Sequence, residues 1–392
     1  MHIAVRIGAA ILVAAALSFA ATPLVKKFAH RVGAIDVPKD ARRVHKHPIP
    51  RLGGLAIFIA FLLGVVLFAE INRQVQGILL GAVVVVALGV VDDIKPLPAL
   101  FKFFVQILAA IVVVLHGVVI EFMSNPIPWD PSPYIYFGVF SIPLTVLWIV
   151  AITNAFNLID GLDGLAAGVS IISSIVMLII ALLVAESNVA IIMAALAGAC
   201  LGFLRYNFNP AKIFMGDAGA LLLGYVLATI SIIGLFKFQA VVSFAVPFLA
   251  LALPLFDTTL SFIRRLLKGQ NPMSPDRGHF HHRLLDMGLS QKQAVLVLYA
   301  ISGLLGLCAV VISTNGEIRA IIFIAAILVA AGIVYFAYRK GKRTSTAETS
   351  EESVENPAEP GEIPVDNSEA ELEPVQTKPT ADVSASKRDS DL

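Results

Sequence analysis

Long apolar stretches alternate with shorter polar ones along most of this chain. Each apolar stretch is continuous, and roughly 20 helical residues cross a bilayer core, so the pattern predicts membrane-spanning helices and not a barrel. About eleven spans are expected from this periodicity, near residues 3–25, 52–68, 76–91, 102–119, 135–152, 164–185, 189–204, 218–236, 241–262, 293–313 and 317–338.

The composition agrees with this fold class. Hydrophobic residues make up 57% of the chain and charged residues 15%, whereas soluble domains have about 25% charged residues. We therefore expect an all-α polytopic membrane protein with a transmembrane domain at residues 1–343. Residues 344–392 contain 13 Asp and Glu, three Lys and Arg and no aromatic residue. Such a segment cannot bury enough apolar surface to fold, which predicts a disordered acidic tail.

The Lys and Arg residues predict the orientation. The odd-numbered connections, counted with Lys102 at the start of the fourth span and with residues 339–343, carry 22 of them. The even-numbered connections, counted with Arg319 near the start of the last span, carry three. The side richer in Lys and Arg is normally cytoplasmic, so we expect the amino terminus outside and the carboxyl terminus in the cytoplasm. The first span also resembles a signal peptide, but its cleavage would require export of a very basic first loop. An uncleaved first helix in the plasma membrane is the expectation.

Two adjacent acids, Asp92 and Asp93, end the third span. One interpretation is a solvated helix end. However, carboxylates at a helix C-terminus oppose the helix dipole and repel each other unless a cation or a nearby base such as Lys102 offsets them. Such a pair suits a general base or a magnesium site.

A more specific pattern follows the fifth span. Four polar residues recur every three positions, which predicts that they lie close together on one helical face or in a tight turn; they are Asn154, Asn157, Asp160 and Asp163. Gly161 and Gly164 would let a bulky ligand approach the backbone. The alternative is that these amides and acids cap the neighbouring spans.

The eighth span begins near Asp217, downstream of Asn207. Asp217 could be the N-cap of that helix. Equally, its carboxylate could hold a cation bound to phosphates, beside backbone N–H groups that favour anions. Both interpretations remain open at this point.

The ninth connection holds clustered bases in a Pro- and Gly-rich loop: His279, His281, His282 and Arg283. These residues suit a diphosphate or a nucleotide. Zinc is the competing use of clustered histidines, but the surrounding acids and amides favour a hard, oxygen-binding ion. Asp257, inside the ninth span, is a functional candidate unless a partner such as Arg264 explains it.

Six strings in this order resemble one known family: RLGG (51–54), VDD (91–93), NAFNLIDGLDGLAAG (154–168), NFNPAKIFMGDAG (207–219), PLFD (254–257) and GHFHHRLL (278–285). They are similar to the polyprenyl-phosphate N-acetylhexosamine-1-phosphate transferase superfamily, glycosyltransferase family 4, over residues 1 to about 338. Arg283 after the histidines resembles the WecA/TagO-type branch, which uses N-acetylglucosamine 1-phosphate. The phospho-MurNAc-pentapeptide transferases are the alternative branch.

The resemblance implies a reaction in which a UDP-N-acetylhexosamine gives its sugar 1-phosphate to a polyprenyl phosphate in the lipid bilayer. It implies Mg²⁺, with Mn²⁺ as an alternative, held by Asp217 and Asn157. Asp92 or Asp93 would prepare the lipid phosphate, and Lys102 would lie near the phosphates. The remaining candidates would shape the nucleotide-sugar pocket: Asn154, Asp160, Asp163, Asn207, His279, His281, His282 and Arg283.

Other functions stay open from the sequence. An ion-coupled transporter would hold its key polar residues near the middle of the membrane, on interrupted helices, whereas most acids here lie at span ends. A membrane scaffold gives no reason for the repeated Asn and Asp residues. No nucleic-acid partner is expected, and a homodimer is an open question.

Overall fold

The computed structural model describes residues 2–38, 47–125, 132, 134–234, 245–267, 269, 279–313 and 324. Helices dominate this part of the chain, and four short strands accompany them. The elements are α1 (Ile3–Val32), β1 (Ile35–Asp36), β2 (Ile49–Pro50), α2 (Gly53–Phe68), α3 (Arg73–Ile94), α4 (Ala99–Leu115), β3 (Phe122–Ser124), β4 (Tyr134–Tyr136), η1 (Gly138–Phe140), α5 (Ser141–Ile159), α6 (Leu165–Leu183), α7 (Ser187–Asn207), α8 (Gly216–Gly234), α9 (Ala245–Ala250), α10 (Ala252–Leu267), α11 (Phe280–Asp286) and α12 (Gln291–Ser313).

Seven helical segments in the described ranges are long and apolar enough to cross a membrane: α1, α3, η1 with α5, α6, α7, α8 and α12. Two more apolar helices, α2 and α4, are shorter. The expectation of a polytopic, helical membrane protein is confirmed. The number of eleven spans and the orientation of the termini remain predictions. The expected last span, 317–338, and the tail at 344–392 fall outside the described residues, apart from residue 324.

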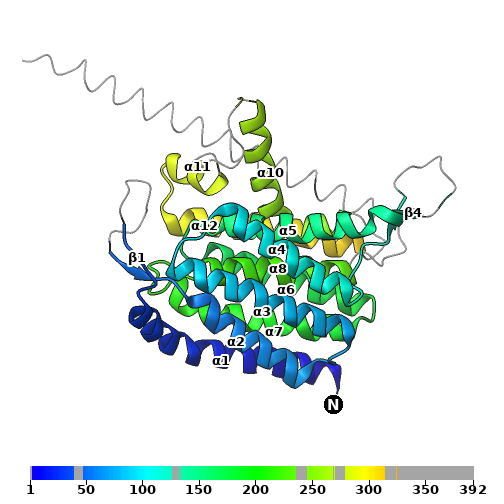
Figure 1. Cartoon of the computed structure of the whole chain (residues 1–392), viewed down its shortest axis with the longest axis horizontal. Helices are drawn as coiled ribbons and strands as arrows, with labels where there is room; N and C mark the ends of the chain where they lie inside the picture. The colour runs from blue at the N-terminus through cyan, green and yellow to red at the C-terminus, as the bar shows by residue number, and fades with distance from the viewer. Residues whose placement is uncertain are drawn as a thin grey trace, which may run out of the picture. The chain divides into compact units, whose positions relative to one another are not determined.

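Helix α8 forms the centre of the bundle. All of its residues from Ala218 to Gly234 are buried, and helices α2, α3, α5, α6 and α7 pack around it. Helix α1 lies on the outside, against α7 and α2. Figure 1 shows these helices side by side, running in nearly the same direction across the view. A helix with apolar residues on every face is typical of a protein core or of a membrane span, which agrees with the central position of α8.

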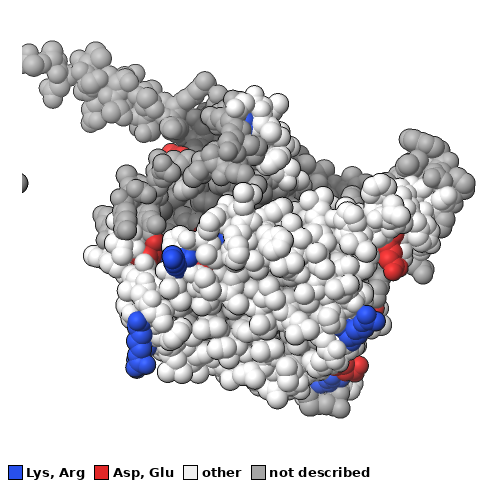
Figure 2. Space-filling view, in the orientation of Figure 1, with Lys and Arg blue, Asp and Glu red and all other residues white. Residues whose placement is uncertain are grey.

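The outer surface of the bundle is apolar. Large exposed side chains include Leu12 of α1, Leu80 of α3, Phe104 of α4 and Leu147 of α5. In Figure 2 the face towards the viewer is white across its middle, and the Lys, Arg, Asp and Glu residues lie towards its two ends. A soluble protein rarely exposes so large an apolar patch, whereas this band suits contact with lipid.

The ninth expected span, 241–262, differs from the prediction of one continuous helix. Its described part consists of the short α9 and of α10, separated at Leu251. Pro247 lies in α9, and Pro254 lies in the first turn of α10, where a proline is tolerated because it need not donate a hydrogen bond. Figure 1 shows α10 rising across the direction of the bundle.

Alternation of helix direction brings polar segments to one end of the bundle. Strands β1 and β2 pair there in antiparallel register, with Asp36 opposite Ile49. The chain then continues into an isolated parallel bridge between Arg51 and Phe214. The Gly53 N–H donates to the Phe214 carbonyl at 2.9 Å. These bonds fix the start of α2 beside the loop that leads into α8.

Candidate functional site

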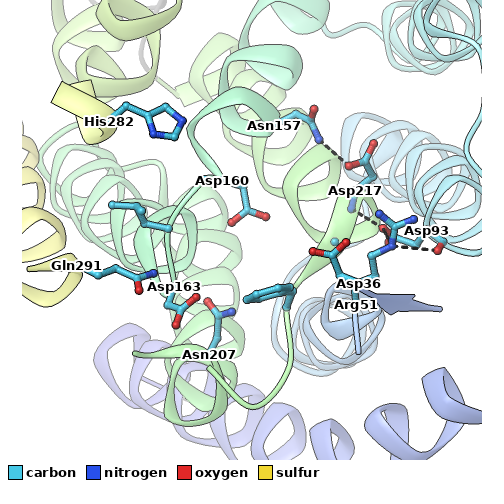
Figure 3. Close-up of a pocket in the computed structure, with 14 residues that line it drawn as sticks. Asp36, Arg51, Asp93, Asn157, Asp160, Asp163, Asn207, Asp217, His282 and Gln291 are labelled. Carbon is cyan, nitrogen blue, oxygen red and sulfur yellow. Dashed lines mark hydrogen bonds and ion pairs between the residues drawn. The ribbon is translucent and has the colours of Figure 1, made fainter. Parts of the chain in front are cut away.

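A cavity of about 360 Å³ opens at this end of the bundle. In Figure 3 the side chains of Asp36 and Asp160 point towards each other across this space, and the Asp217 carboxylate is directed towards Asn157. Its lining comes from the β1–β2 segment, the ends of α3, α5 and α7, and the starts of α8, α11 and α12: Asp36, Arg51, Asp93, Asn157, Asp160, Gly161, Leu162, Asp163, Asn207, Phe214, Gly216, Asp217, His282 and Gln291.

Lys102 connects two of the acids. Its Nζ lies 3.0 Å from Asp92 Oδ2 and 3.0 Å from Asp217 Oδ2. The other Asp92 oxygen accepts a hydrogen bond from the Leu97 N–H at 2.7 Å. The first turn of α4 therefore supplies an ammonium group between the end of α3 and the start of α8, where it offsets the charge of both carboxylates.

Asp93 holds the start of α8. Its two oxygens accept hydrogen bonds from the backbone N–H groups of Asp217, at 3.0 Å, and Ala218, at 3.1 Å. The residue is only 2% exposed, and Arg51 Nε lies 3.1 Å from its carbonyl oxygen. A carboxylate at a helix N-terminus is favourable. The cap thus comes from another helix, which leaves the Asp217 side chain available to the cavity.

Asp217 also contacts α5. The Asn157 Nδ2 donates to Asp217 Oδ1 at 3.1 Å, so these two expected metal ligands do lie together. Asp160, just after α5, faces the same cavity, and its pKa is raised to about 7 by burial and by the negative charges of Asp217 and Asp163. Neutral and ionised Asp160 therefore coexist near pH 7.

Asp163 and Asn207 hold loops as well as line the cavity. Asp163 Oδ2 accepts from Asn209 Nδ2 and from the Ala211 N–H, both at 2.9 Å. Asn207 accepts from the Gly164 N–H at 3.1 Å and donates to the Ile213 carbonyl at 3.0 Å. For Asp163, the alternative that these acids hold neighbouring segments therefore remains open beside a role in the cavity, and Asn207 also holds the segments on either side of it.

Asn154 does not line this cavity. Its Nδ2 lies 2.5 Å from Gln106 Oε1 and 2.8 Å from the Val150 carbonyl, so it contacts α4. Gln106 lies one helical turn after Lys102. Asn154 therefore helps to fix the helix that carries Lys102.

The three expected histidines lie close together at α11. The rings of His279 and His281 are nearly parallel at 5.6 Å, and those of His281 and His282 are 4.4 Å apart. His282 lines the cavity, whereas His281 is 2% exposed. Burial, and then the charge of His282, lowers the pKa of His281 to about 4. His281 is therefore neutral, and its Nδ1 has no hydrogen-bond partner among the described residues.

Gly161 makes room for this histidine cluster. A Cβ atom at Gly161 would overlap the imidazole ring of His281. The space expected for a bulky ligand at Gly161 is thus filled by the protein's own side chain. This contact joins the turn after α5 to α11, two segments far apart in the sequence.

Asp257 has a partner other than the expected Arg264. Its Oδ2 lies 2.9 Å from His279 Nδ1, and its Oδ1 accepts from the Phe280 N–H at 2.7 Å. Asp257 therefore positions the start of α11. Arg283, expected in the substrate pocket, is exposed on α11 and is not among the residues that line the cavity.

Three polar residues that line the cavity were not among the predicted site residues: Asp36, Arg51 and Gln291. Arg51 belongs to the RLGG string, so the sequence did contain a signal that this residue lies near the site. Asp36 and Gln291 are single polar residues in loops or at a helix start. Only the folded chain shows that they face Asp217 and Asp163.

The donor set suits a hard cation more than zinc. Within the described ranges, no group of three His, Cys, Asp or Glu side chains is placed to hold a metal ion. Structural zinc sites normally need four such ligands. Mg²⁺ is often bound through one or two carboxylates, with water and substrate phosphates completing its shell. Asp217 and Asn157 fit that second pattern.

Comparisons with known proteins identify the family of this chain. Residues 75–235 match the model of glycosyl transferase family 4. A probable undecaprenyl-phosphate N-acetylglucosaminyl 1-phosphate transferase of Bacillus subtilis (strain 168) is 42% identical, over 79% of this chain and 86% of its own. A decaprenyl-phosphate N-acetylglucosaminephosphotransferase of Mycolicibacterium smegmatis is 38% identical, over 75% and 79%.

A more distant relative gives the same result. An undecaprenyl-phosphate alpha-N-acetylglucosaminyl 1-phosphate transferase of Thermotoga maritima is 32% identical, over 75% of this chain and 88% of its own. The matched family segment contains Asp92, Lys102, Asn157 and Asp217, which the fold brings together. The chain therefore belongs to glycosyl transferase family 4, within the polyprenyl-phosphate N-acetylhexosamine-1-phosphate transferase superfamily.

Proposed function

We propose that this protein transfers N-acetylglucosamine 1-phosphate, or a closely related N-acetylhexosamine 1-phosphate, from a UDP-sugar to a polyprenyl phosphate. An oxygen of the lipid phosphate forms a bond to the sugar-bearing phosphorus. The bond from that phosphorus to the bridging oxygen breaks, and this oxygen leaves with UMP. The other product is a polyprenyl-diphospho-sugar. The names of the similar proteins and the chemistry of the cavity support this proposal.

The arrangement of Lys102 between Asp92 and Asp217 is the observation that carries the proposal. Phosphoryl transfer between two anionic substrates depends mainly on positioning and on charge stabilisation. A phosphate monoester has a second pKa near 6, so the lipid phosphate is largely ionised at neutral pH without a base. The protein must instead bring cationic groups to the phosphates, and Lys102 and Arg51 lie beside this cavity.

We propose Asp217 and Asn157 as the residues that hold Mg²⁺, with Mn²⁺ as an alternative. The cation, when bound, would offset the negative charge that the donor diphosphate and the lipid phosphate bring together. The Asn157 amide donates to Asp217 through Nδ2, and rotation of that amide would present its oxygen instead. Lys102 would move its ammonium group from Asp217 towards the phosphates as the site fills.

Asp92 and Asp93 act, in this proposal, by holding other groups. Asp92 orients Lys102, and Asp93 fixes the backbone that carries Asp217. Asp160 and His282 face the remaining volume of the cavity, where they would contact the nucleotide-sugar. With a pKa raised to about 7, Asp160 can accept or donate a hydrogen bond there.

We further propose that the cavity faces the cytoplasm across the plasma membrane. The excess of Lys and Arg in the connections at this end supports that orientation. A cysteine replacing Glu70, at the opposite end, should react with a membrane-impermeant reagent added outside, and one replacing Lys95 should not. The native Cys200 and Cys308 are buried. The reverse labelling pattern would place the cavity outside.

The deciding experiment is a donor panel with the purified full chain and a polyprenyl phosphate. UDP-N-acetylglucosamine should yield UMP and a lipid product in equal amounts. UDP-MurNAc-pentapeptide should yield neither, which separates the two branches of the family. UMP without a lipid product, or a product from the pentapeptide donor alone, would contradict the proposal.

The Asp217→Asn variant tests whether Asp217 holds the metal ion. Loss of this charged group should lower the rate about a thousandfold or more, and EDTA should abolish activity of the unchanged protein. Asp286→Asn removes the same charge from an exposed position on α11 and should have little effect. Near-normal turnover by Asp217→Asn would exclude Asp217 as a metal ligand.

A further inference from the structure

A second cavity lies beside the candidate active site. Its volume is about 430 Å³, and it shares Asp163 and Gln291 with the first cavity. Asn209 donates to both of these side chains, at 2.9 Å to Asp163 Oδ2 and at 2.6 Å to Gln291 Oε1. The hydrogen-bonded side chains of Asp163, Asn209 and Gln291 therefore lie between the two cavities.

Basic side chains from three separate segments line this second cavity. Lys26 and His30 come from the last turns of α1, His47 precedes β2, and Lys212 lies in the loop before α8. The cavity contains one acid, Asp163, whose Oδ2 already accepts two hydrogen bonds. A concave surface lined mainly by one sign of charge attracts ligands of the opposite sign. The ligand that suits this cavity is an anion.

The helix that supplies Lys26 and His30 also carries an apolar stripe leading to them. Residues seven apart, or three and four apart, share one face of a helix, so Leu12 and Phe19 lie on the same face of α1 as Lys26. Leu12 is 71% exposed and Phe19 is 49% exposed. Helix α1 is long and apolar enough to span a membrane. The stripe would therefore contact acyl chains, and the cavity would stand at its polar end.

We propose that the second cavity binds the phosphate headgroup of an anionic membrane phospholipid, with an acyl chain along Leu12 and Phe19. Basic pockets at the cytoplasmic ends of transmembrane helices recognise such headgroups. The apolar stripe favours a lipid over a free phosphate ion, because only the lipid would use both surfaces. Its occupation would also stabilise the wall formed by Asp163, Asn209 and Gln291. Because Asp163 and Gln291 also line the first cavity, the bound lipid would raise turnover at the neighbouring active site.

Lipid binding can be measured without any UDP-sugar, by native mass spectrometry of the full chain with phosphatidylglycerol or phosphatidylcholine. The unchanged protein should retain phosphatidylglycerol preferentially. Lys26→Gln should weaken that retention about fivefold. Lys27→Gln removes the same charge from the next residue of α1, which is exposed and does not line the cavity, and should change retention by less than about twofold.

Three results would overturn the inference. They are equal retention of the two lipids, equal weakening by the Lys26 and Lys27 substitutions, and displacement of the lipid by millimolar inorganic phosphate. The last result would show a site for a soluble anion. Lys26→Gln and Lys27→Gln should both keep the fold, since neither residue is fully buried, and their melting temperatures provide the check.

The effect on the neighbouring site rests on the proposed function and has its own readout. Turnover in phosphatidylcholine nanodiscs should rise severalfold when phosphatidylglycerol is added, and Lys26→Gln should lose that response. Selective lipid binding in a protein with no transferase activity would leave the lipid site standing and remove the proposed function. Transferase activity without selective lipid binding would support the proposed function and would exclude the lipid site.

Discussion

Replacing Lys102 by methionine removes the cation between two carboxylates. Its Nζ lies 3.0 Å from Asp92 Oδ2 and 3.0 Å from Asp217 Oδ2. Methionine is unbranched and flexible and fills a similar space, so the substitution removes charge with little loss of packing. Asp92 and Asp217 would then face each other without the ammonium group.

The separation of these carboxylates sets the expected magnitude. With oxygens about 6 Å apart or closer and an effective dielectric constant of about 20, two unit charges repel by roughly 3 kcal/mol. The variant also loses the ammonium group that would contact the phosphates. Together these changes should lower turnover about 100- to 1,000-fold. The uncompensated acids should attract a dication more strongly, so half-saturation with Mg²⁺ should occur at about tenfold lower concentration.

The assay is UMP release at saturating substrates over a titration of Mg²⁺. Lys102→Arg keeps the charge and should retain more activity than Lys102→Met, although its planar fork fits the two acids differently. Lys95→Met removes an exposed lysine from the adjacent loop and should leave both values unchanged. Turnover of Lys102→Met within about threefold of the unchanged protein, with the same requirement for Mg²⁺, would refute this account of the site.

Four further predictions follow from other contacts. Asp93→Asn leaves only one acceptor oxygen for the two backbone N–H groups at the start of α8. The unpaired buried N–H costs about 1–3 kcal/mol, and the variant should have a lower melting temperature and lower turnover. The raised pKa of Asp160 stabilises the fold fully at low pH and loses that contribution as pH rises through about 7. Relative to Asp160→Asn, the unchanged protein should therefore lose about 2–3 kcal/mol of stability between pH 5 and 8.5, seen as a falling melting temperature. Gly89→Ala should push α3 away from α8 and reduce turnover by tenfold or more, by roughly 1.4 kcal/mol, while Gly8→Ala in open space on α1 should be neutral. Truncation after Arg343 should keep turnover within about twofold, and a tenfold loss in a folded, inserted protein would assign the tail a role.

The positions of the long apolar helices were predictable from the sequence, because a membrane-spanning helix requires a long run of apolar residues. The expected span at 52–68 corresponds to α2 at Gly53–Phe68, and the span at 293–313 corresponds to α12 at Gln291–Ser313. The break at Leu251 was not predicted, although Pro247 and Pro254 gave a signal for it. Average hydropathy does not register two prolines in an otherwise apolar stretch.

The candidate site was only partly predictable, and helix geometry explains why. Steps of three residues rotate about 300° around a helix of 3.6 residues per turn, so a three-residue repeat drifts steadily off one face. Asn154 accordingly contacts α4, and Asn157 contacts Asp217. Helix α5 ends at Ile159, so Asp160 and Asp163 lie in the following turn. The repeat indicated the right segment but not one shared cluster.

The two acids at the end of α3 illustrate how tertiary structure changes the meaning of a local pattern. Viewed alone, Asp92 and Asp93 oppose the dipole of their own helix. Gly89, one turn earlier, lies so close to Ala218 that a Cβ atom would overlap the α8 backbone. This close approach brings Asp93 against the first N–H groups of α8.

The unfavourable end of α3 is therefore compensated by the favourable end of α8. Asp93 gains the partial positive charge of that N-terminus, and Asp92 gains Lys102. Because Asp93 satisfies the backbone, the Asp217 carboxylate need not cap its own helix and can face the cavity instead. The VDD string at the end of α3 and the MGDAG string at the start of α8 therefore contact each other. The close packing of Gly89 against α8 determines the position of the acidic site.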